Sequence, residues 1–242
     1  MLIICKLTGT KGKGVKSHII PESFYEIPPQ TEGCLKLASN ISGGFIKKIP
    51  VGIYDSGIVT QKGEDIFNTW DNYAAKTLLN RSGELEPLIR KQEIIGWNLN
   101  RVNSSLLKLF ALSMLWRAHA SSQVMFTNVD LGIHEPIIRS MLLKSDPGKE
   151  DDYSVFIVKW TNDERGPVYM DPLYERYEGV NFYRFYGGRF IFYIKIDQRK
   201  TPLKLNPFQL ADGPDLTLAA RDLEKSKELS LIIKIVRKNL SQ

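Results

Sequence analysis

A histidine and two acidic residues in the first third of the chain have the types and spacing needed for acid–base or metal chemistry. His18 follows Ser17 in a short apolar run that Pro21 stops, and Glu64 and Asp65 stand at the start of a helical pattern. Imidazole is the side chain that exchanges a proton near neutral pH, and carboxylates are ligands for hard divalent cations. Chemistry between them requires that the histidine strand and the start of the helix lie side by side.

The hydrophobic pattern predicts those two elements. Short apolar runs at 2–4, 15–20 and 49–59, set among Gly, Pro, Ser and Lys, indicate short strands joined by a long irregular loop. Apolar residues between 66 and 78 recur at three- and four-residue spacing, which predicts a helix from about 63 to 80. Glu64 and Asp65 then occupy the first helical turn, where the helix dipole favours negative charge, and that role alone would account for them.

This order of elements resembles the HNH, or ββα-metal, nuclease motif. Val-Lys-Ser-His-Ile-Ile-Pro at 15–21 resembles the first strand, followed by a loop at 21–57, a second strand at 58–60 and the helix at 63–80. The chain is also similar to uncharacterised bacterial and phage-type HNH-like proteins in Cys-Lys-Leu-Thr-Gly at 5–9 and in the apolar run 109–118. The resemblance implies that His18 is the general base.

The same resemblance implies a set of metal ligands. Glu64 falls at the helix-start position of a ligand, and Ser17 stands where many family members have an Asp or a second His. The remaining candidates are two reserves on the helix, a reserve on the loop side and a match to the middle asparagine of the motif: Asp65, Asn68, Asp55 and Asn40. Oxygen ligands of this kind suit Mg²⁺ or Mn²⁺.

The implied reaction is hydrolysis of a phosphodiester bond. A neutral imidazole takes a proton from water while a divalent cation stabilises charge on the phosphate and the leaving oxygen. We therefore expect a metal-dependent nuclease acting on DNA, in phage defence or mobile-element conflict. Two alternatives stand beside it: a degenerate HNH-like domain that binds nucleic acid without cutting, and a protein-interaction or inhibitor module. A protein partner or a homo-oligomer stays open.

Many HNH proteins brace the motif with a structural zinc held by two Cys-x-x-Cys pairs. Here the matching positions are Cys5 with Thr8, and Thr60 with Gly63, so one thiolate of four remains and no structural zinc is expected. The two threonines are expected to hydrogen-bond across the site instead. The only other cysteine is Cys34, and both are expected to be free thiols.

The composition is that of a globular protein with a basic excess. The chain has 33 Lys and Arg against 27 Asp and Glu and a pI near 9.1, which suits a polyanionic partner. The candidates for nucleic-acid contact are six early lysines: Lys11, Lys13, Lys16, Lys47, Lys48 and Lys62. A solvated loop surface would explain them equally well. Apolar runs are too short for a membrane span and no secretory signal is recognisable, so a cytoplasmic protein without a membrane partner is expected.

The rest of the chain predicts an α+β protein in which an N-terminal ββα-metal-like module packs against a larger region. We expect the module at 1–82, a polar connector at 83–103 and an α+β accessory domain with an antiparallel sheet at 104–242. Its predicted elements are a buried helix at about 106–120 capped by Ser104 or Ser105, a helix at 136–143, strands at 153–160, 180–186 and 189–196, and a helical segment at 216–240.

Three features of this region are expected to be structural. The pair Gly187-Gly188 predicts a two-residue hairpin turn. Arg117 on the buried helix is expected to have an internal charge partner, and the aromatic row from 182 to 193 is expected to form a core face rather than a base-stacking surface.

Overall fold

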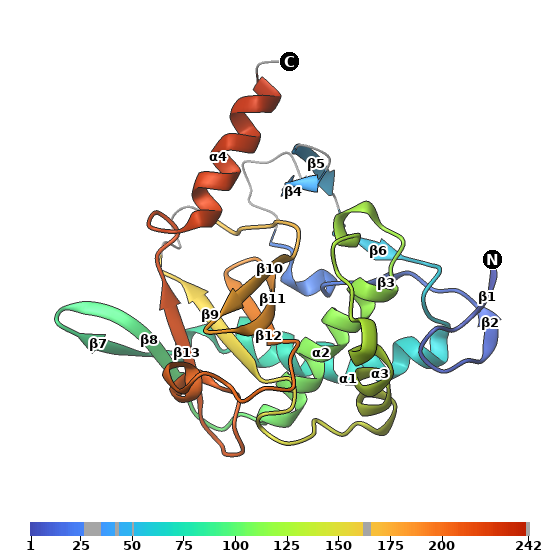
Figure 1. The fold of residues 1–242 in the computed structure, drawn as a ribbon, viewed down its shortest axis with the longest axis horizontal. Helices are drawn as coiled ribbons and strands as arrows, with labels where there is room; N and C mark the ends of the chain where they lie inside the picture. The colour runs from blue at the N-terminus through green and yellow to red at the C-terminus, as the bar shows by residue number, and fades with distance from the viewer. Residues whose placement is uncertain (27–34, 42–43, 50, 162–165, 241–242) are drawn as a thin grey trace.

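The computed structural model describes residues 1–26, 35–41, 44–49, 51–161 and 166–240, and Cys34 lies outside them. It contains a seven-stranded sheet at its centre (Figure 1). Neighbouring strands are antiparallel except for one parallel pair, β13 with β9. In spatial order the strands are β10 (Leu173–Tyr177), β11 (Val180–Gly187), β12 (Phe190–Lys195), β9 (Val155–Trp160), β13 (Leu216–Arg221), β8 (Glu93–Leu99) and β7 (Glu86–Arg90). The fold is therefore α+β with a mostly antiparallel sheet, as predicted.

Helices and loops cover both faces of this sheet. Side chains alternate along a strand, so Phe190 and Phe192 of β12 join the main core while Ile191 between them joins a second cluster. The main core lies against α2 (Ser104–Ala120), which packs in turn on α1 (Gln61–Ala74) and α3 (Glu135–Lys144). The second cluster lies under α4 (Lys227–Leu240), and a 3₁₀ turn at Leu203–Phe208 packs beside it. The aromatic row is thus mainly core.

The helix α2 is buried almost all round, as its apolar sequence predicts. Its side chains from Leu107 to Ala118 are buried without exception. The residue that caps it is Asn103, whose side chain accepts a hydrogen bond from the backbone of Leu106 at 3.1 Å. The prediction of a serine cap was wrong because the helix begins two residues earlier than expected, at Ser104.

Short strands precede α1. A hairpin joins β1 (Leu2–Ile4) and β2 (Lys11–Lys13), and β3 (Ser17–His18) pairs antiparallel with β6 (Tyr54–Asp55). The second strand was expected at 58–60. In the structure the carbonyls of Ile58 and Val59 accept backbone hydrogen bonds from the N-terminal segment, and Thr60 is the extended N-cap residue of α1, which begins at Gln61.

Between β3 and β6 the chain forms another hairpin, β4 (Leu35–Ser39) with β5 (Phe45–Ile49). The expected irregular loop therefore contains regular structure. The C-terminal end of α1 continues into a π-helical turn, Ala75–Asn80. The helical segment therefore extends over the predicted range.

Three elements differ from the sequence predictions. The expected connector at 83–103 contains the β7–β8 hairpin, whose two-residue turn is Lys91-Gln92 with φ of 49° and 65°. Non-glycine residues rarely adopt such angles, so the usual turn signal is missing from the sequence. The first part of the expected C-terminal helix is β13, where Leu216 and Leu218 are buried alternately. The β11–β12 turn is two residues long but lies at 188–189, because Gly187 pairs with Phe190.

One continuous core joins the N-terminal region to the sheet. The core includes Cys5 and Leu7 from the N-terminal segment, Phe67 and Trp70 from α1, and residues of α2 and β12. None of the helices in the described part of the chain is long and apolar enough to cross a membrane.

Candidate functional site

His18 has one ring nitrogen fixed and the other available. Its Nε2 lies 2.8 Å from the carbonyl oxygen of Val51. A carbonyl oxygen only accepts, so Nε2 carries the hydrogen, and in the neutral ring Nδ1 holds the lone pair. No described residue is hydrogen-bonded to Nδ1. The Tyr54 ring meets the imidazole edge to face, with centroids 5.7 Å apart. The ring is therefore oriented to accept a proton at Nδ1.

The backbone of His18 is held by a buried arginine on α2. Arg117 donates to the carbonyl oxygen of His18 at 2.7 Å and to both carboxylate oxygens of Asp71 on α1 at 2.8 Å. The remaining donors bond to Ser113 on the same helix as Arg117. Burial raises the pKa of Asp71, and the Arg117 guanidinium opposes that rise. One guanidinium thus fixes the positions of α1, α2 and β3 relative to each other.

Glu64 enters the same junction from the first turn of α1. Its Oε2 and the Oγ of Ser17 are both buried and have no hydrogen-bond partner among the described residues. Burial raises the pKa of the Glu64 carboxyl, the Ser17 hydroxyl and the charges of Arg117 and His18 work to lower it, and Asp71 raises it. The Ser17 hydroxyl is therefore near enough to influence Glu64, although it is outside hydrogen-bond geometry. The structure places Glu64 near Ser17, and the charge of His18 is close enough to influence the pKa of Glu64.

The oxygens of Glu64 and Ser17 fit a divalent cation only as part of a larger shell. An unpaired buried carboxylate oxygen costs free energy that a cation or water would recover. Mg²⁺ often takes one or two carboxylates and completes its six positions with waters and substrate phosphates. Within the described ranges no group of three His, Cys, Asp or Glu side chains is able to hold a metal. Asp71 is committed to Arg117. These donors fit a cation that arrives with a phosphate better than one held by protein alone.

The positions that match the zinc cysteines of HNH proteins meet beside this site. The Cys5 Sγ accepts a hydrogen bond from the Thr8 backbone at 3.4 Å, and a Cβ atom on Gly63 would lie 3.0 Å from it. Burial works to raise the pKa of the Cys5 thiol, but hydrogen bonds from Thr8 and the Thr60 backbone outweigh it and lower the pKa below 9.0. The expected Thr8–Thr60 bond was wrong: the Thr8 hydroxyl pairs with Thr10 at 2.7 Å. Close packing around Cys5 therefore fills the space between the N-terminal segment and the start of α1.

The four reserve positions lie elsewhere. Asp65 is exposed and accepts a hydrogen bond from Gln61 at 2.8 Å, and Asn68 is exposed on the next turn of α1. Asn40 follows β4, where its backbone donates to the buried Asp171 at 2.6 Å.

Asp55 has a structural position. Its carboxylate accepts hydrogen bonds from Gly57, Ser121 and both the backbone and hydroxyl of Ser122, at 2.7 to 3.0 Å. Burial works to raise its pKa, and these hydrogen bonds outweigh burial and lower it. A carboxylate with so many donors ties β6 to the end of α2.

The candidate lysines fall into two groups. Lys11, Lys13, Lys16 and Lys62 are exposed around the start of α1, and the Lys16 ammonium lies 5.0 Å from the centroid of the Tyr54 ring that contacts His18. Lys47 and Lys48 are exposed on β5, which packs against α4 rather than α1. The early lysines are therefore not one surface.

Sequence reasoning missed three contributors to the His18 site. Val51, Tyr54 and Asp71 contact either the histidine or the arginine behind it. Val51 acts through its backbone, which no residue type reveals. Asp71 could have been found from the sequence, because a carboxylate seven residues after Glu64 lies on the same helix face. Arg117 was also expected to have an internal charge partner.

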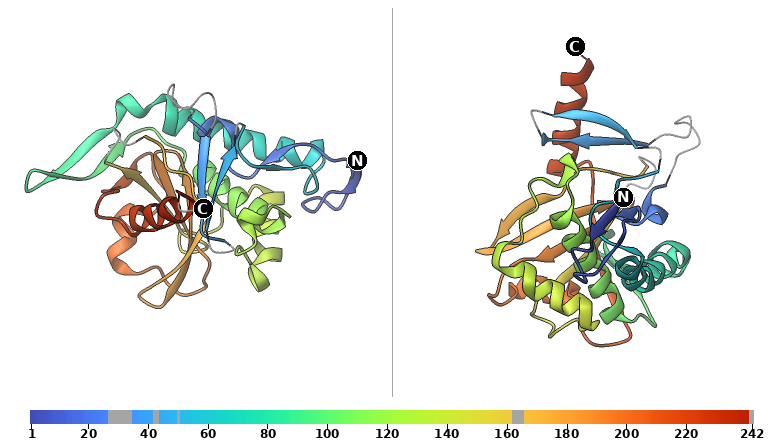
Figure 2. Two further views of the ribbon diagram at one scale, coloured as in Figure 1. Left: turned by 90° about the horizontal axis from the view of Figure 1, so that it is seen from above. Right: turned by 90° about the vertical axis from the view of Figure 1, so that its right-hand side faces the viewer.

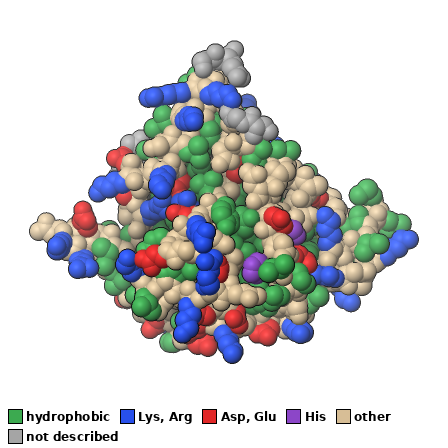
Figure 3. Space-filling model, viewed as in Figure 1, with side chains coloured by type: hydrophobic (Ala, Val, Ile, Leu, Met, Phe, Trp, Pro, Cys, Tyr) green, Lys and Arg blue, Asp and Glu red, His purple; other side chains and the backbone are tan. Residues whose placement is uncertain are grey.

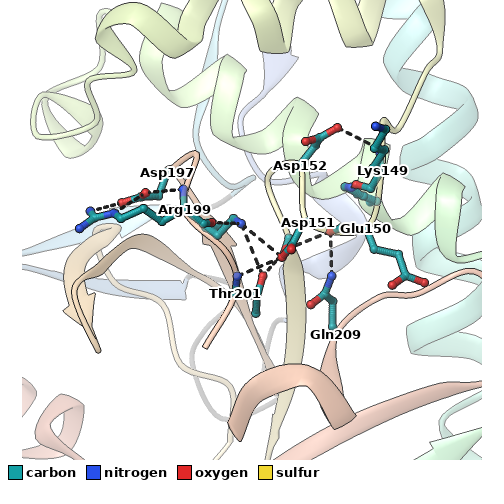
Figure 4. Close-up of polar contacts among 11 residues, drawn as sticks. Lys149, Glu150, Asp151, Asp152, Asp197, Arg199, Thr201 and Gln209 are labelled. Atoms are coloured by element: carbon teal, nitrogen blue, oxygen red, sulfur yellow. Dashed lines mark hydrogen bonds and ion pairs between the residues drawn. The ribbon is translucent and has the colours of Figure 1, made fainter. Parts of the chain in front are cut away.

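A second polar cluster lies where the segment before β9 meets the loop after β12 (Figure 4). It lines an open hollow of about 620 Å³ and includes Asp151, Thr201 and Gln209. Asp151 accepts from the Thr201 backbone at 3.0 Å, and Asp197 accepts from the Arg199 backbone at 2.9 Å. Asp197 is bonded within its own turn and Asp151 to a separate loop, so the cluster joins loops and is not a candidate site.

Comparison with models of known protein families, with curated proteins and with solved structures finds no match to this chain. The HNH-like interpretation therefore depends on the motif residues and on the geometry around His18.

Proposed function

We propose that this protein is an HNH-like, divalent-metal-dependent nuclease that hydrolyses phosphodiester bonds in DNA. The observation that carries the proposal is the hydrogen bond from His18 Nε2 to the Val51 carbonyl, which leaves Nδ1 as the proton acceptor. The Glu64 carboxyl, whose Oε2 is buried and unpaired among the described residues, is near enough for the charge of His18 to lower its pKa.

Each residue then has a defined task. His18 accepts a proton at Nδ1 from the attacking water, and Arg117 and Val51 keep its backbone and ring in place. Glu64 and Ser17 would hold Mg²⁺ or Mn²⁺, which when bound supplies positive charge to the phosphate. Lys16 and Lys62, with Lys11 and Lys13, are expected to attract the nucleic-acid backbone toward this junction.

The direct test is cleavage of supercoiled plasmid DNA with Mg²⁺ or Mn²⁺. We expect His18→Ala to lower the rate by about 10²- to 10⁴-fold, the usual contribution of a general base. Glu64→Gln is expected to require more metal for the same rate. His134→Ala is the matched histidine control, because His134 bonds Tyr153 outside this site. Cleavage by His18→Ala at the wild-type rate would exclude this mechanism.

A second candidate function is favoured by the small number of metal donors. Since the described residues contain no three-ligand group, and Ser17 is a weaker ligand than the Asp or His of related motifs, a domain that binds nucleic acid without cutting fits equally well here. Retention of labelled DNA in EDTA, combined with no cleavage under either metal, would support it.

A further inference from the structure

A basic arm projects from the body of the protein. We define it as residues 35–49 of the β4–β5 hairpin, apart from 42 and 43, and residues 229–240 of α4. Figures 1 and 2 show α4 and this hairpin standing side by side above the sheet, and α4 packs against both strands. Gly44 approaches so closely that a Cβ there would lie 3.2 Å from Ile235. The hairpin and helix therefore present one surface.

The arm accounts for the net charge of the whole chain. It carries six cations and no Asp or Glu: Lys36, Lys47, Lys48, Lys234, Arg237 and Lys238. The chain has 33 Lys and Arg against 27 Asp and Glu; when these six are set aside, 27 of each sign remain. Figure 3 shows Lys and Arg side chains gathered at this apex. The Lys, Arg, Asp and Glu charges of the rest of the protein sum to zero, so the excess positive charge of the chain equals that of the arm.

The packing of α4 argues against a lipid surface as that polyanion. A helix that lies in a membrane interface presents a continuous apolar face to lipid. Here Leu229 and Ile232 pack on the second hydrophobic cluster, which lies under α4. Ile235 is 3% exposed and lies against Gly44. Of the apolar side chains of α4, Ile233 and Leu240 are exposed, at 40% and 82%, which does not make a continuous apolar face. The basic residues of the helix are exposed.

The arm also lacks the means to read bases by stacking. Its only aromatic residue is Phe45, which packs against the main core. Base stacking requires exposed aromatic rings, whereas lysines bind phosphates regardless of sequence.

We propose that the basic arm binds the phosphate backbone of nucleic acid without reading its sequence. The choice of nucleic acid among polyanions rests on the proposed function. The arm is separate from the lysines around His18, so binding by the arm does not require that the His18 site cleave.

The test is fluorescence anisotropy in EDTA, with labelled random-sequence duplexes of DNA and of RNA, over a range of salt concentrations. The arm variant is Lys47→Gln, Lys48→Gln, Lys234→Gln. The matched control, Lys91→Gln, Lys144→Gln, Lys200→Gln, removes the same charge from exposed sites elsewhere. Thermal melting by circular dichroism checks that both remain folded.

We expect the arm variant to bind at least about tenfold more weakly and the slope of log affinity against log salt to become shallower by about 2.7 on DNA, or 0.9 per lost contact. The control should change neither by that amount. Tight binding to RNA but not DNA would support phosphate binding by the arm and identify RNA as the nucleic acid.

Equal losses in both variants, no binding by the wild type, or binding only to phosphatidylserine vesicles would overturn the proposal. Failure of the proposed function is a different result: arm-dependent binding with no plasmid cleavage would contradict the nuclease proposal and support the proposal for the arm.

Discussion

Arg117 donates to both carboxylate oxygens of Asp71 at 2.8 Å, and the arginine side chain is fully buried between α1 and α2. A buried ion pair of this kind contributes more to position than to net stability, because desolvation offsets much of its attraction. Its value here is that the same guanidinium also holds the carbonyl of His18.

Removing one partner of this pair is therefore expected to be costly. Arg117→Met should lower the free energy of unfolding by about 3–5 kcal/mol, because it leaves Asp71 buried without a partner. The double variant Arg117→Met, Asp71→Leu should lose less than Arg117→Met alone. Urea denaturation of the two variants measures this, and strictly additive losses would contradict it.

The close packing around Cys5 predicts a strong effect at one glycine. A Cβ on Gly63 would lie 3.0 Å from both Cys5 Sγ and Val59 Cβ. We expect Gly63→Ala to destabilise by about 1–3 kcal/mol, the usual cost of overpacking. Gly83→Ala is the control, since nothing lies within 4 Å of a Cβ there. If Gly63→Ala melts like the control, the corner around Cys5 is looser than described.

Glu64 predicts a pH dependence with a defined sign. Burial raises its pKa above the ordinary 4.5, so the folded protein holds this proton more tightly than the unfolded chain. The resulting stability is complete below the unfolded pKa and is lost as the pH rises through the folded pKa. Glu64→Gln cannot ionise, so its melting temperature relative to wild type should increase as the pH rises from about 4 upward.

Thermal melts across that range test this prediction. Asp65→Asn, in the same helical turn, is the control for removal of a negative charge. A melting-temperature difference between Glu64→Gln and wild type that stays constant with pH would show that burial does not govern this carboxyl.

The shared core predicts that the N-terminal region depends on the rest of the chain. A fragment of residues 1–82 keeps Asp71, Phe67 and Trp70 but loses α2, against which α1 packs. We expect this fragment to lack a cooperative thermal transition. A sharp two-state melt at the stability of the full chain would make it an independent domain.

Sequence patterns predicted the elements whose stability is local or strongly periodic. The apolar run of α2 and the repeated spacing of α1 indicated helices within two residues of their observed starts. Sequence patterns failed for the strands whose structure depends on pairing with distant segments. The apolar alternation of β13 covers only six residues before a helix, and the β7–β8 turn contains no glycine.

The parts of the candidate site that depend on side-chain type could be predicted from the sequence. His18, Ser17 and Glu64 were named from their residue types and positions, and in the structure both Ser17 and His18 influence the pKa of Glu64. The carbonyls of Val51 and His18 that fix the site are backbone groups, and every residue has one. Asn40 and Lys47 were assigned by order along the chain, but the hairpin carries them toward α4 instead.

The basic arm has a consequence for motion before contact. Because the arm carries a charge equal to the net charge of the chain and lies at one end of the body, the field of a distant polyanion attracts that end and exerts a torque on the molecule. The protein would turn as it diffuses, so that α4 and the β4–β5 hairpin lead and the sheet follows.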